Sequence, residues 1–314
     1  MDIHSVCIFG GTGFVGRSIA EQAVASGLHV RVVTRTALNA KPLLVLPTLD
    51  VEVADPNDEK SLARCLKDMD AAINLVGILH EGGGATFEAV HAGLPRRIVR
   101  ACRTAGVKRL VHMSSLGASA SGPSAYQRSK AAGEAAVREP DAPAHTIFRP
   151  SVIFGEQDSF LNLFASLIRL APVLPLASPR ARFQPVWVED VARCFVAALG
   201  DARTHGQVYE LGGPRVTTLE ELVAFVGATL GRRPAIVPLP ASLAYLQALV
   251  LEYLPGHVMT RDNLRSMSVD NVCAGPFPSV FGFEPTPMEA VVPGYLAAAE
   301  INSRYQRFRN LAGR

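Results

Sequence analysis

VCIFGGTGFVG, the stretch from Val6 to Gly16, decides the fold of this chain. It begins with apolar β-forming residues and runs directly into glycines, after which residues 17–26 follow a helical pattern. Gly10 permits a sharp turn, Gly13 lets the backbone approach a phosphate, and Gly16 lets the helix lie close to the strand. The free N–H groups and positive dipole end of a helix attract anions. The stretch therefore predicts a site for a dinucleotide pyrophosphate rather than a glycine-rich loop without a ligand.

The composition excludes several classes of protein. With 48% hydrophobic and 19% charged residues among 314, the chain can bury a large core and is not expected to be disordered. Its net charge of +3 and its dispersed arginines predict no nucleic-acid partner. Five scattered cysteines contain no CxxC pair, and eight histidines contain no HExxH motif. We therefore expect reduced thiols, no metal site and a cytoplasmic location.

No secretory or membrane-spanning segment is expected. The first strand begins almost at Met1, which leaves no room for a secretory signal. The most apolar stretch, residues 160–177, is interrupted by Asn162, Arg169 and two prolines and makes a poor membrane span.

Strands and helices alternate through the first 150 residues. The expected strands are residues 6–9, 29–35, 50–54, 71–77, 109–115 and 144–150, and the expected helices are residues 17–26, 60–67, 87–104 and 125–138. This alternation predicts right-handed crossovers and an α/β fold with a doubly wound parallel sheet of the Rossmann type. Beyond Pro150 the rhythm loosens, although 185–199 and 208–213 still show strand and helix patterns.

These patterns predict two domains. Residues 1–150, rejoined by 185–214, should form the nucleotide-binding domain. Residues 151–184 and 215–314 should form a smaller, discontinuous substrate-binding region, with the substrate entering between it and the nucleotide site.

A tyrosine and a lysine four positions apart, Tyr126 and Lys130, are expected on one face of the helix at 125–138. A cation beside a phenol favours the phenolate and lowers its pKa, which makes a general acid or base usable near neutral pH. The spacing is common on solvated helix faces. Here it follows a nucleotide turn and the pair Ser114-Ser115 in an order that suits a catalytic site.

Together these motifs resemble the short-chain dehydrogenase/reductase superfamily, and PVWVEDVA (185–192) is similar to its extended, epimerase/dehydratase-like branch. The other segments that carry the resemblance are GGTGFVG, NLVG, MSS, YQRSK and RPSVIFG. The resemblance implies that Tyr126 is the proton donor or acceptor and that Lys130 holds the nicotinamide ribose. Ser115 would bond the substrate carbonyl or hydroxyl, with Ser114 as the alternative.

The resemblance also implies a set of cofactor contacts. The pyrophosphate would lie over Thr12 to Val15, and Asp55 would lie near the adenine. Pro150 and Val152 would lie beside the nicotinamide. The whole set, with Tyr126 and Lys130, is Gly10, Thr12, Gly13, Phe14, Val15, Gly16, Arg35, Asp55, Gly77, Pro150 and Val152.

Two positions depart from the pattern of the resemblance. Tyr126 follows Ser115 by only eleven positions, fewer than in typical sugar-nucleotide epimerases. At the end of the second strand the chain has Thr34 and Arg35 where an NAD-binding relative carries an acidic residue. Because an arginine can bind a 2′-phosphate that a carboxylate would repel, NADP(H) is the expected cofactor, with NAD as the alternative and a solvent-facing loop charge as the plain interpretation of Arg35.

Within the superfamily, the chain resembles the atypical branch that contains the NADPH-binding accessory subunit of respiratory complex I and its bacterial relatives. The similar segments are SAYQRSKAAGE (124–134), VIFGEQDSFLNLFA (152–165) and MTRDNLRSMSVDNV (259–272). In this branch the nucleotide of the mitochondrial subunit is thought to be structural, so the resemblance leaves open whether the nucleotide is consumed or held.

Three functions stay open. The first is an NADP(H)-dependent oxidoreductase acting on a carbonyl or secondary alcohol of a hydrophobic small molecule. The second is a structural nucleotide-binding subunit or assembly partner of a respiratory or quinone-handling complex, peripheral to the inner membrane. It would use apolar segments 160–177 and 245–254 and the basic, aromatic residues 304–309. The third, ranked lower, is a sugar-nucleotide epimerase or dehydratase with Arg180 or Arg182 on a diphosphate.

Overall fold

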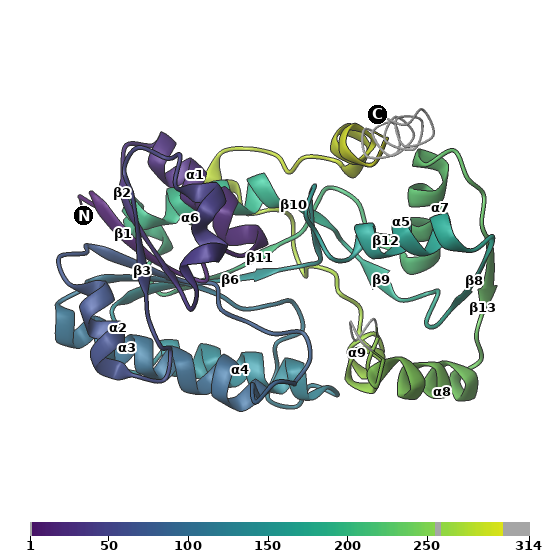
Figure 1. Ribbon diagram of the computed structural model, residues 1–314, viewed down its shortest axis with the longest axis horizontal. Helices are drawn as coiled ribbons and strands as arrows, with labels where there is room; N and C mark the ends of the chain where they lie inside the picture. Colours follow the sequence, from purple (N-terminus) through teal and green to yellow (C-terminus); the bar gives the residue numbers. More distant parts are fainter. Residues whose placement is uncertain (1, 255–258, 298–314) are drawn as a thin grey trace, which may run out of the picture. The chain divides into compact units, whose positions relative to one another are not determined.

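A seven-stranded parallel sheet carries the nucleotide-turn stretch at its centre (Figure 1). The computed structural model describes residues 2–254 and 259–297. The strand order is β11-β6-β5-β4-β1-β2-β3. The strands are β1 (Ser5–Phe9), β2 (His29–Thr34), β3 (Leu49–Val53), β4 (Ala71–Asn74), β5 (Arg109–Met113), β6 (Ala144–Pro150) and β11 (Gln207–Leu211). The expected doubly wound parallel sheet is therefore confirmed.

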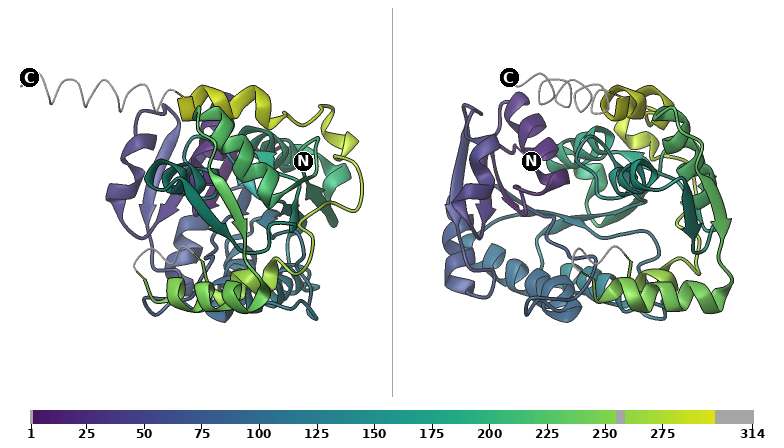
Figure 2. Two further views of the ribbon diagram at one scale, coloured as in Figure 1. Left: turned by 90° about the vertical axis from the view of Figure 1, so that its right-hand side faces the viewer. Right: turned by 45° about the vertical axis from the view of Figure 1, so that its right-hand side comes forward.

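Helices cover both faces of this sheet, with α1 and α6 on one face and α2, α3 and α4 on the other (Figures 1 and 2). They are α1 (Phe14–Ala25), α2 (Glu59–Leu66), α3 (Leu94–Ala105), α4 (Ala125–Val137) and α6 (Val188–Gly200). The central strands are apolar on both faces, and the side chains of Ile8, Ile73 and Val111 are fully buried. Burial on both faces is what a parallel sheet between two helical layers requires.

Several expected elements differ in their bounds from the structure, and two of the differences have a local cause. The strand expected at 71–77 ends at Asn74, because the Asn74 side chain accepts the N–H of Val76 (3.2 Å) and turns the chain out of the sheet. The helix expected at 87–104 is a π-helical segment, Glu88–Gly93, followed by α3. Pro95 has no N–H to donate to the residue four before it, which favours this irregular start.

A second unit is built from short strands and helices. Its strands are β7 (Ile153–Phe154), β8 (Val173–Leu176), β9 (Arg182–Phe183), β10 (Val186–Trp187), β12 (Thr217–Thr218) and β13 (Ala235–Pro238). They pair as β10-β7, β12-β9 and β13-β8. Its helices are α5 (Leu161–Leu170), α7 (Leu219–Thr229), α8 (Ala241–Glu252) and α9 (Arg261–Ser266), and α5 and α7 each contribute several buried side chains to its core.

The chain crosses between the two units several times. The first unit contains residues 1–150, 188–211 and 273–283, and the second contains residues 151–187, 212–272 and 284–314. The return of residues 273–283 to the first unit is not indicated by any pattern in the sequence. In the described residues, no helix is long and apolar enough to cross a membrane.

Candidate functional site

The glycine turn between β1 and α1 is closed by backbone contacts. Gly10 has φ +82°, and the N–H of Gly13 donates to its carbonyl oxygen at 3.0 Å. A Cβ on Gly16 would lie 2.3 Å from that same oxygen, so a side chain there would collide with the turn. Gly16 thus allows the helix to pack against the turn itself, and only a residue without a Cβ fits.

The start of α1 suits an anion. Gly13 is the N-cap and makes no side-chain cap, and the first turn holds no acidic residue. The first amides of a helix have no partner inside the helix, so they can donate to a phosphate. Arg17 Nε donates to the carbonyl oxygen of Thr12 at 3.0 Å and steadies the loop. The pyrophosphate contact expected over Thr12 to Val15 stays a prediction, to which this helix start offers free amides.

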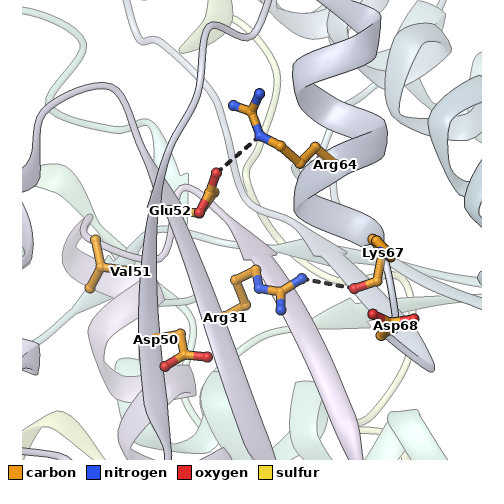
Figure 3. A pocket seen from close by; sticks show the side chains of 7 residues that line it. All are labelled: Arg31, Asp50, Val51, Glu52, Arg64, Lys67 and Asp68. Atoms are coloured by element: carbon orange, nitrogen blue, oxygen red, sulfur yellow. Dashed lines mark hydrogen bonds and ion pairs between the residues drawn. The ribbon is translucent and has the colours of Figure 1, made fainter.

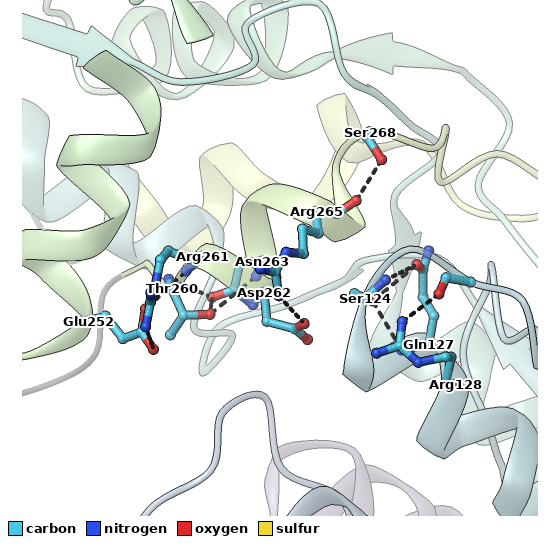
Figure 4. Close-up of polar contacts among 11 residues, drawn as sticks. Ser124, Gln127, Arg128, Glu252, Thr260, Arg261, Asp262, Asn263, Arg265 and Ser268 are labelled. Carbon is cyan, nitrogen blue, oxygen red and sulfur yellow. Dashed lines mark hydrogen bonds and ion pairs between the residues drawn. The ribbon is translucent and has the colours of Figure 1, made fainter. Parts of the chain in front are cut away.

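The three residues with predicted catalytic roles all lie in the first unit, at the carboxyl end of β5 and in the first turns of α4. Ser115 follows β5, and Tyr126 and Lys130 belong to α4. A capping box starts α4, with Ser124 accepting the N–H of Gln127 (3.1 Å) and Gln127 Oε1 accepting the N–H of Ser124 (3.3 Å; Figure 4).

Ser115 and Tyr126 interact through their side chains. The Ser115 Oγ atom is buried and makes no hydrogen bond of standard geometry to another described residue, yet it lies close enough to the phenol to lower the pKa of Tyr126. A buried hydroxyl without a full partner has hydrogen-bonding capacity left for a substrate oxygen.

Lys130 does not tune Tyr126 as the sequence suggested. Its Nζ donates to the carbonyl oxygen of Met113 at 2.8 Å, and burial lowers the pKa of Lys130 to about 8, with Glu134 opposing. Burial also raises the pKa of Tyr126, and the neighbouring Ser115 offsets only part of that rise. The expected lowering of the phenol pKa by Lys130 was therefore wrong for this structure, because burial dominates.

Ser114 has a different neighbour. Its hydroxyl lowers the pKa of Glu134, a buried carboxylate that also accepts two hydrogen bonds of 2.7 Å from Arg149. Ser115 is thus the better of the two serines for a role beside Tyr126.

The remaining predicted cofactor residues lie on separate loops. Gly77 follows β4 on a loop that starts with Leu75, and the backbone of Leu75 and Val76 lies close to Gly10. Arg35 is exposed and, among the described residues, has no ion pair or hydrogen bond. The Asp55 carboxylate accepts the N–H of Asn57 at 2.9 Å in the loop before α2.

The two residues predicted beside the nicotinamide are held by different partners. In the first unit, the Pro150 carbonyl accepts the N–H of Leu116 at 3.0 Å, which ties the residue after Ser115 to the end of β6. In the second unit, the N–H of Val152 donates to Asn271 Oδ1 at 3.2 Å, and Ser151 Oγ donates to the same oxygen at 2.6 Å.

His91, a residue with no role expected from the sequence, lies in contact with Tyr126. The imidazole and phenol rings meet edge to face with centroids 5.4 Å apart, and Phe87 stacks on the imidazole at 5.4 Å. Two signals in the sequence could have indicated this contact. Pro95, shortly after His91, could have indicated an irregular helix at His91, and Ser129, beside Lys130, could have indicated a polar partner for the imidazole.

A shallow hollow beside β3 holds none of the predicted site residues (Figure 3). In it, Arg31 Nη1 donates to the carbonyl oxygens of Cys65 and Lys67 at 2.9 Å, and Arg64 pairs with Glu52 at 3.2 Å. These contacts cap the end of α2 and leave the charges balanced. The described ranges 2–254 and 259–297 contain no cluster of histidine, cysteine or carboxylate side chains suited to a metal ion.

Comparisons with known proteins agree with the motifs. The description "NAD dependent epimerase/dehydratase family" belongs to a family model that matches residues 6–212. The chain is 34% identical to mitochondrial NADH dehydrogenase (ubiquinone) 1 alpha subcomplex subunit 9 of Arabidopsis thaliana, over 80% of this chain and 64% of that protein. It is 31% identical to a ceramide reductase of Caulobacter vibrioides, over 75% of this chain and 73% of that protein.

A solved structure supports the fold. The dTDP-glucose 4,6-dehydratase of Streptomyces venezuelae, with NAD bound, aligns with a TM-score of 0.75 at 19% identity and covers 96% of this chain and 98% of that one. At that identity the likeness concerns the fold alone.

Proposed function

The chain belongs to the NAD-dependent epimerase/dehydratase family, and from that membership we propose an NADP(H)-dependent oxidoreductase that interconverts a carbonyl and a secondary alcohol on a hydrophobic small molecule. The observation that carries the proposal is the buried Ser115 hydroxyl beside the Tyr126 phenol, in the unit that also holds the glycine turn and the start of α1.

The proposed step divides the work between Tyr126 and Ser115. When bound, the nicotinamide supplies a hydride to the carbonyl carbon and is itself oxidised. Ser115 donates a hydrogen bond to the carbonyl oxygen, and Tyr126 transfers its phenolic proton to that oxygen as the C–O bond becomes single. A raised phenol pKa keeps Tyr126 protonated, which suits the reductive direction.

Arg35 supports NADP(H) as the cofactor. Its exposed guanidinium follows β2, where the ribose of a dinucleotide is read in this kind of fold, and it has no partner among the described residues. A guanidinium forms strong, charge-assisted hydrogen bonds to phosphate oxygens. NAD stays the alternative, because Thr34 and Arg35 do not exclude it.

For the substrate we propose an apolar ketone or secondary alcohol, selected by residues 151–184 and 215–314. The ceramide reductase similarity supports a lipid-like substrate. For the sugar-nucleotide alternative, Arg182 pairs with Asp270 at 3.4 Å, which leaves Arg180 as the candidate cation for a diphosphate.

The proposal is tested by measuring the turnover of apolar ketones with NADPH, monitored as the loss of NADPH absorbance. Tyr126→Phe should lower kcat by about 10² to 10⁴-fold while NADPH still binds, because only proton transfer is removed. Tyr209→Phe, on β11 at the sheet edge, is the matched control and should leave kcat unchanged. Full turnover by Tyr126→Phe would contradict the proposed roles.

A second candidate function, attachment to a membrane-bound assembly, is favoured by α8. The helix has one charged residue, Glu252, which pairs with Arg261 at 2.8 Å (Figure 4). It leaves Leu246 and Val250 more than half exposed. The similarity to a complex I subunit supports this function, and we propose an anionic lipid surface as the contact of α8, since the neighbouring helix α9 carries the exposed Arg265.

The other two segments considered for docking differ from α8. In 160–177, the side chains of Leu161, Phe164 and Ile168 are buried in the core of the second unit, whereas Leu170 and Val173 are exposed. The basic, aromatic residues 304–309 lie outside the described residues.

A further inference from the structure

A buried histidine joins the loop after β4 to the turn that carries Tyr126. His91 is 2% exposed, and its Nε2 accepts the N–H of Ile78 at 3.0 Å. Its Nδ1 lies 2.8 Å from Ser129 Oγ, and Ser129 Oγ donates to the carbonyl oxygen of Tyr126 at 2.8 Å. Ile78 directly follows Gly77, so the chain of hydrogen bonds runs from a proposed cofactor loop to the backbone carbonyl of Tyr126 in the first turn of α4.

The directions of these hydrogen bonds fix the tautomer of His91. The amide of Ile78 can only donate, so Nε2 must be unprotonated. A neutral imidazole then carries its proton on Nδ1 and donates it to Ser129 Oγ, and the single proton of that hydroxyl goes to Tyr126. Burial, aided by the charge of Lys130, lowers the pKa of His91 to about 3, so the ring stays neutral at physiological pH.

The same imidazole also orients the phenol ring. His91 packs edge to face against Tyr126, with an interplanar angle of 86°, and Phe87 packs against both rings. A Cβ on Gly133 would lie 2.1 Å from the His91 carbonyl oxygen, so α4 approaches the π-helical segment as closely as backbone allows. Packing this close leaves the His91 imidazole little freedom to shift against Tyr126.

We propose that His91 is a positioning residue for the hydride-transfer site: its neutral imidazole, protonated on Nδ1, holds the Gly77–Ile78 loop and the Tyr126 ring in one fixed arrangement. The inference rests on the proposed function for its catalytic meaning, while its geometry stands on the contacts above. The nucleotide and substrate sides of the site are thereby joined through one side chain.

Nitrogen NMR of histidine-labelled protein and the kinetics of two variants test this proposal. The ring of His91 should show its proton on Nδ1 at neutral pH. His91→Phe keeps a ring but loses both hydrogen bonds, so kcat for a reduced ketone should fall about 10²-fold with little change in KM. His91→Gln keeps an acceptor for Ile78 and a donor for Ser129, and it should restore kcat to within about tenfold of the parent.

His145→Gln serves as the matched control, since His145 lies at the amino end of β6, and it should leave kcat within about twofold of the parent. A proton on Nε2, parental kcat in His91→Phe, or equal loss in His91→Phe and His91→Gln would overturn the proposal.

The binding of NADPH separates this inference from the proposed function. The affinity for NADPH is measured by titration of each variant, and this measurement does not depend on the reduction of any ketone. His91→Phe should weaken NADPH binding by about tenfold because the loop at Gly77 loses its anchor. If Tyr126→Phe shows that the reaction is misassigned, a tenfold loss of NADPH affinity still supports the positioning role, and unchanged affinity refutes it.

Discussion

Two neighbouring serines at the end of β5 have separate tasks, which illustrates how single residues divide the site. The Ser114 hydroxyl lowers the pKa of Glu134, whereas the Ser115 hydroxyl lowers the pKa of Tyr126. The motif MSS predicts a serine at this place, but only the contacts distinguish which one stands beside the phenol.

Arg35 is the single residue expected to distinguish NADP(H) from NAD(H). Arg35→Ser should weaken NADP(H) binding by about 10- to 10²-fold, the value of one or two charge-assisted hydrogen bonds, and should leave NAD(H) binding nearly unchanged. Isothermal titration with both nucleotides measures the ratio. Arg103→Ser, which removes an exposed ion pair on α3, is the control. A loss of equal size for both nucleotides would show that Arg35 does not read the 2′-phosphate.

At the scale of elements, α4 is joined to the sheet by a buried carboxylate. Glu134 is 1% exposed and accepts two hydrogen bonds from Arg149 of β6 and one of 2.9 Å from Arg138. Burial raises the pKa of Glu134, but these hydrogen bonds, the Ser114 hydroxyl and the positive charges lower it by more. The network holds the helix that carries Tyr126 and Lys130 against the strand that ends at Pro150.

The lowered pKa gives a pH prediction. The folded state holds the charged form of Glu134 more strongly than the unfolded state does, so the stabilisation is present above the unfolded-state pKa and is lost as pH falls through the folded-state pKa. Glu134→Gln should therefore lower the free energy of unfolding by about 3 kcal/mol at neutral pH and by less in acid. Urea denaturation at both pH values measures this difference.

The partly exposed partner of this network provides the control. Arg138→Gln removes only the ion pair on the solvent side and should change the free energy of unfolding by less than about 1 kcal/mol. A Glu134→Gln effect that is equally large in acid would show that the carboxylate charge is not what stabilises α4.

For the whole molecule, the exposed apolar face of α8 is a candidate surface for contact with a membrane. Leu246 and Val250 are 53% and 54% exposed, and Tyr253 beyond the helix is 76% exposed. Only Ala244 and Ala248 of this helix are buried, so small residues face the second unit and large apolar ones face outward. Apolar side chains in contact with water at this density commonly mark an interaction surface.

Flotation with lipid vesicles tests this surface. The protein should bind vesicles containing anionic lipid, and the double variant Leu246→Ser, Val250→Ser should reduce binding by about tenfold because it removes the inserted apolar area. Leu38→Ser, an exposed leucine of the first unit, is the control. Equal binding by the double variant and the parent, or no binding by the parent, would count against a lipid contact.

Local pattern was enough for much of this protein. The glycine turn, the order of strands and helices through Pro150, and the position of Ser115, Tyr126 and Lys130 all follow from short-range signals. Steric limits on glycine, burial of apolar strands and helix periodicity act over a few residues, so they can be read from the chain directly.

Other features depend on residues that are far apart in the sequence. His91 meets Ser129 across 38 positions, and Glu134 meets Arg149 across 15, so neither contact leaves a periodic signal. The pKa of Tyr126 also depends on burial, which overrides the expected influence of Lys130. The sequence by itself determined the sheet, the nucleotide turn and the candidate chemistry. Only the tertiary structure decided which buried groups act on one another, because burial and long-range packing set their charges and orientations.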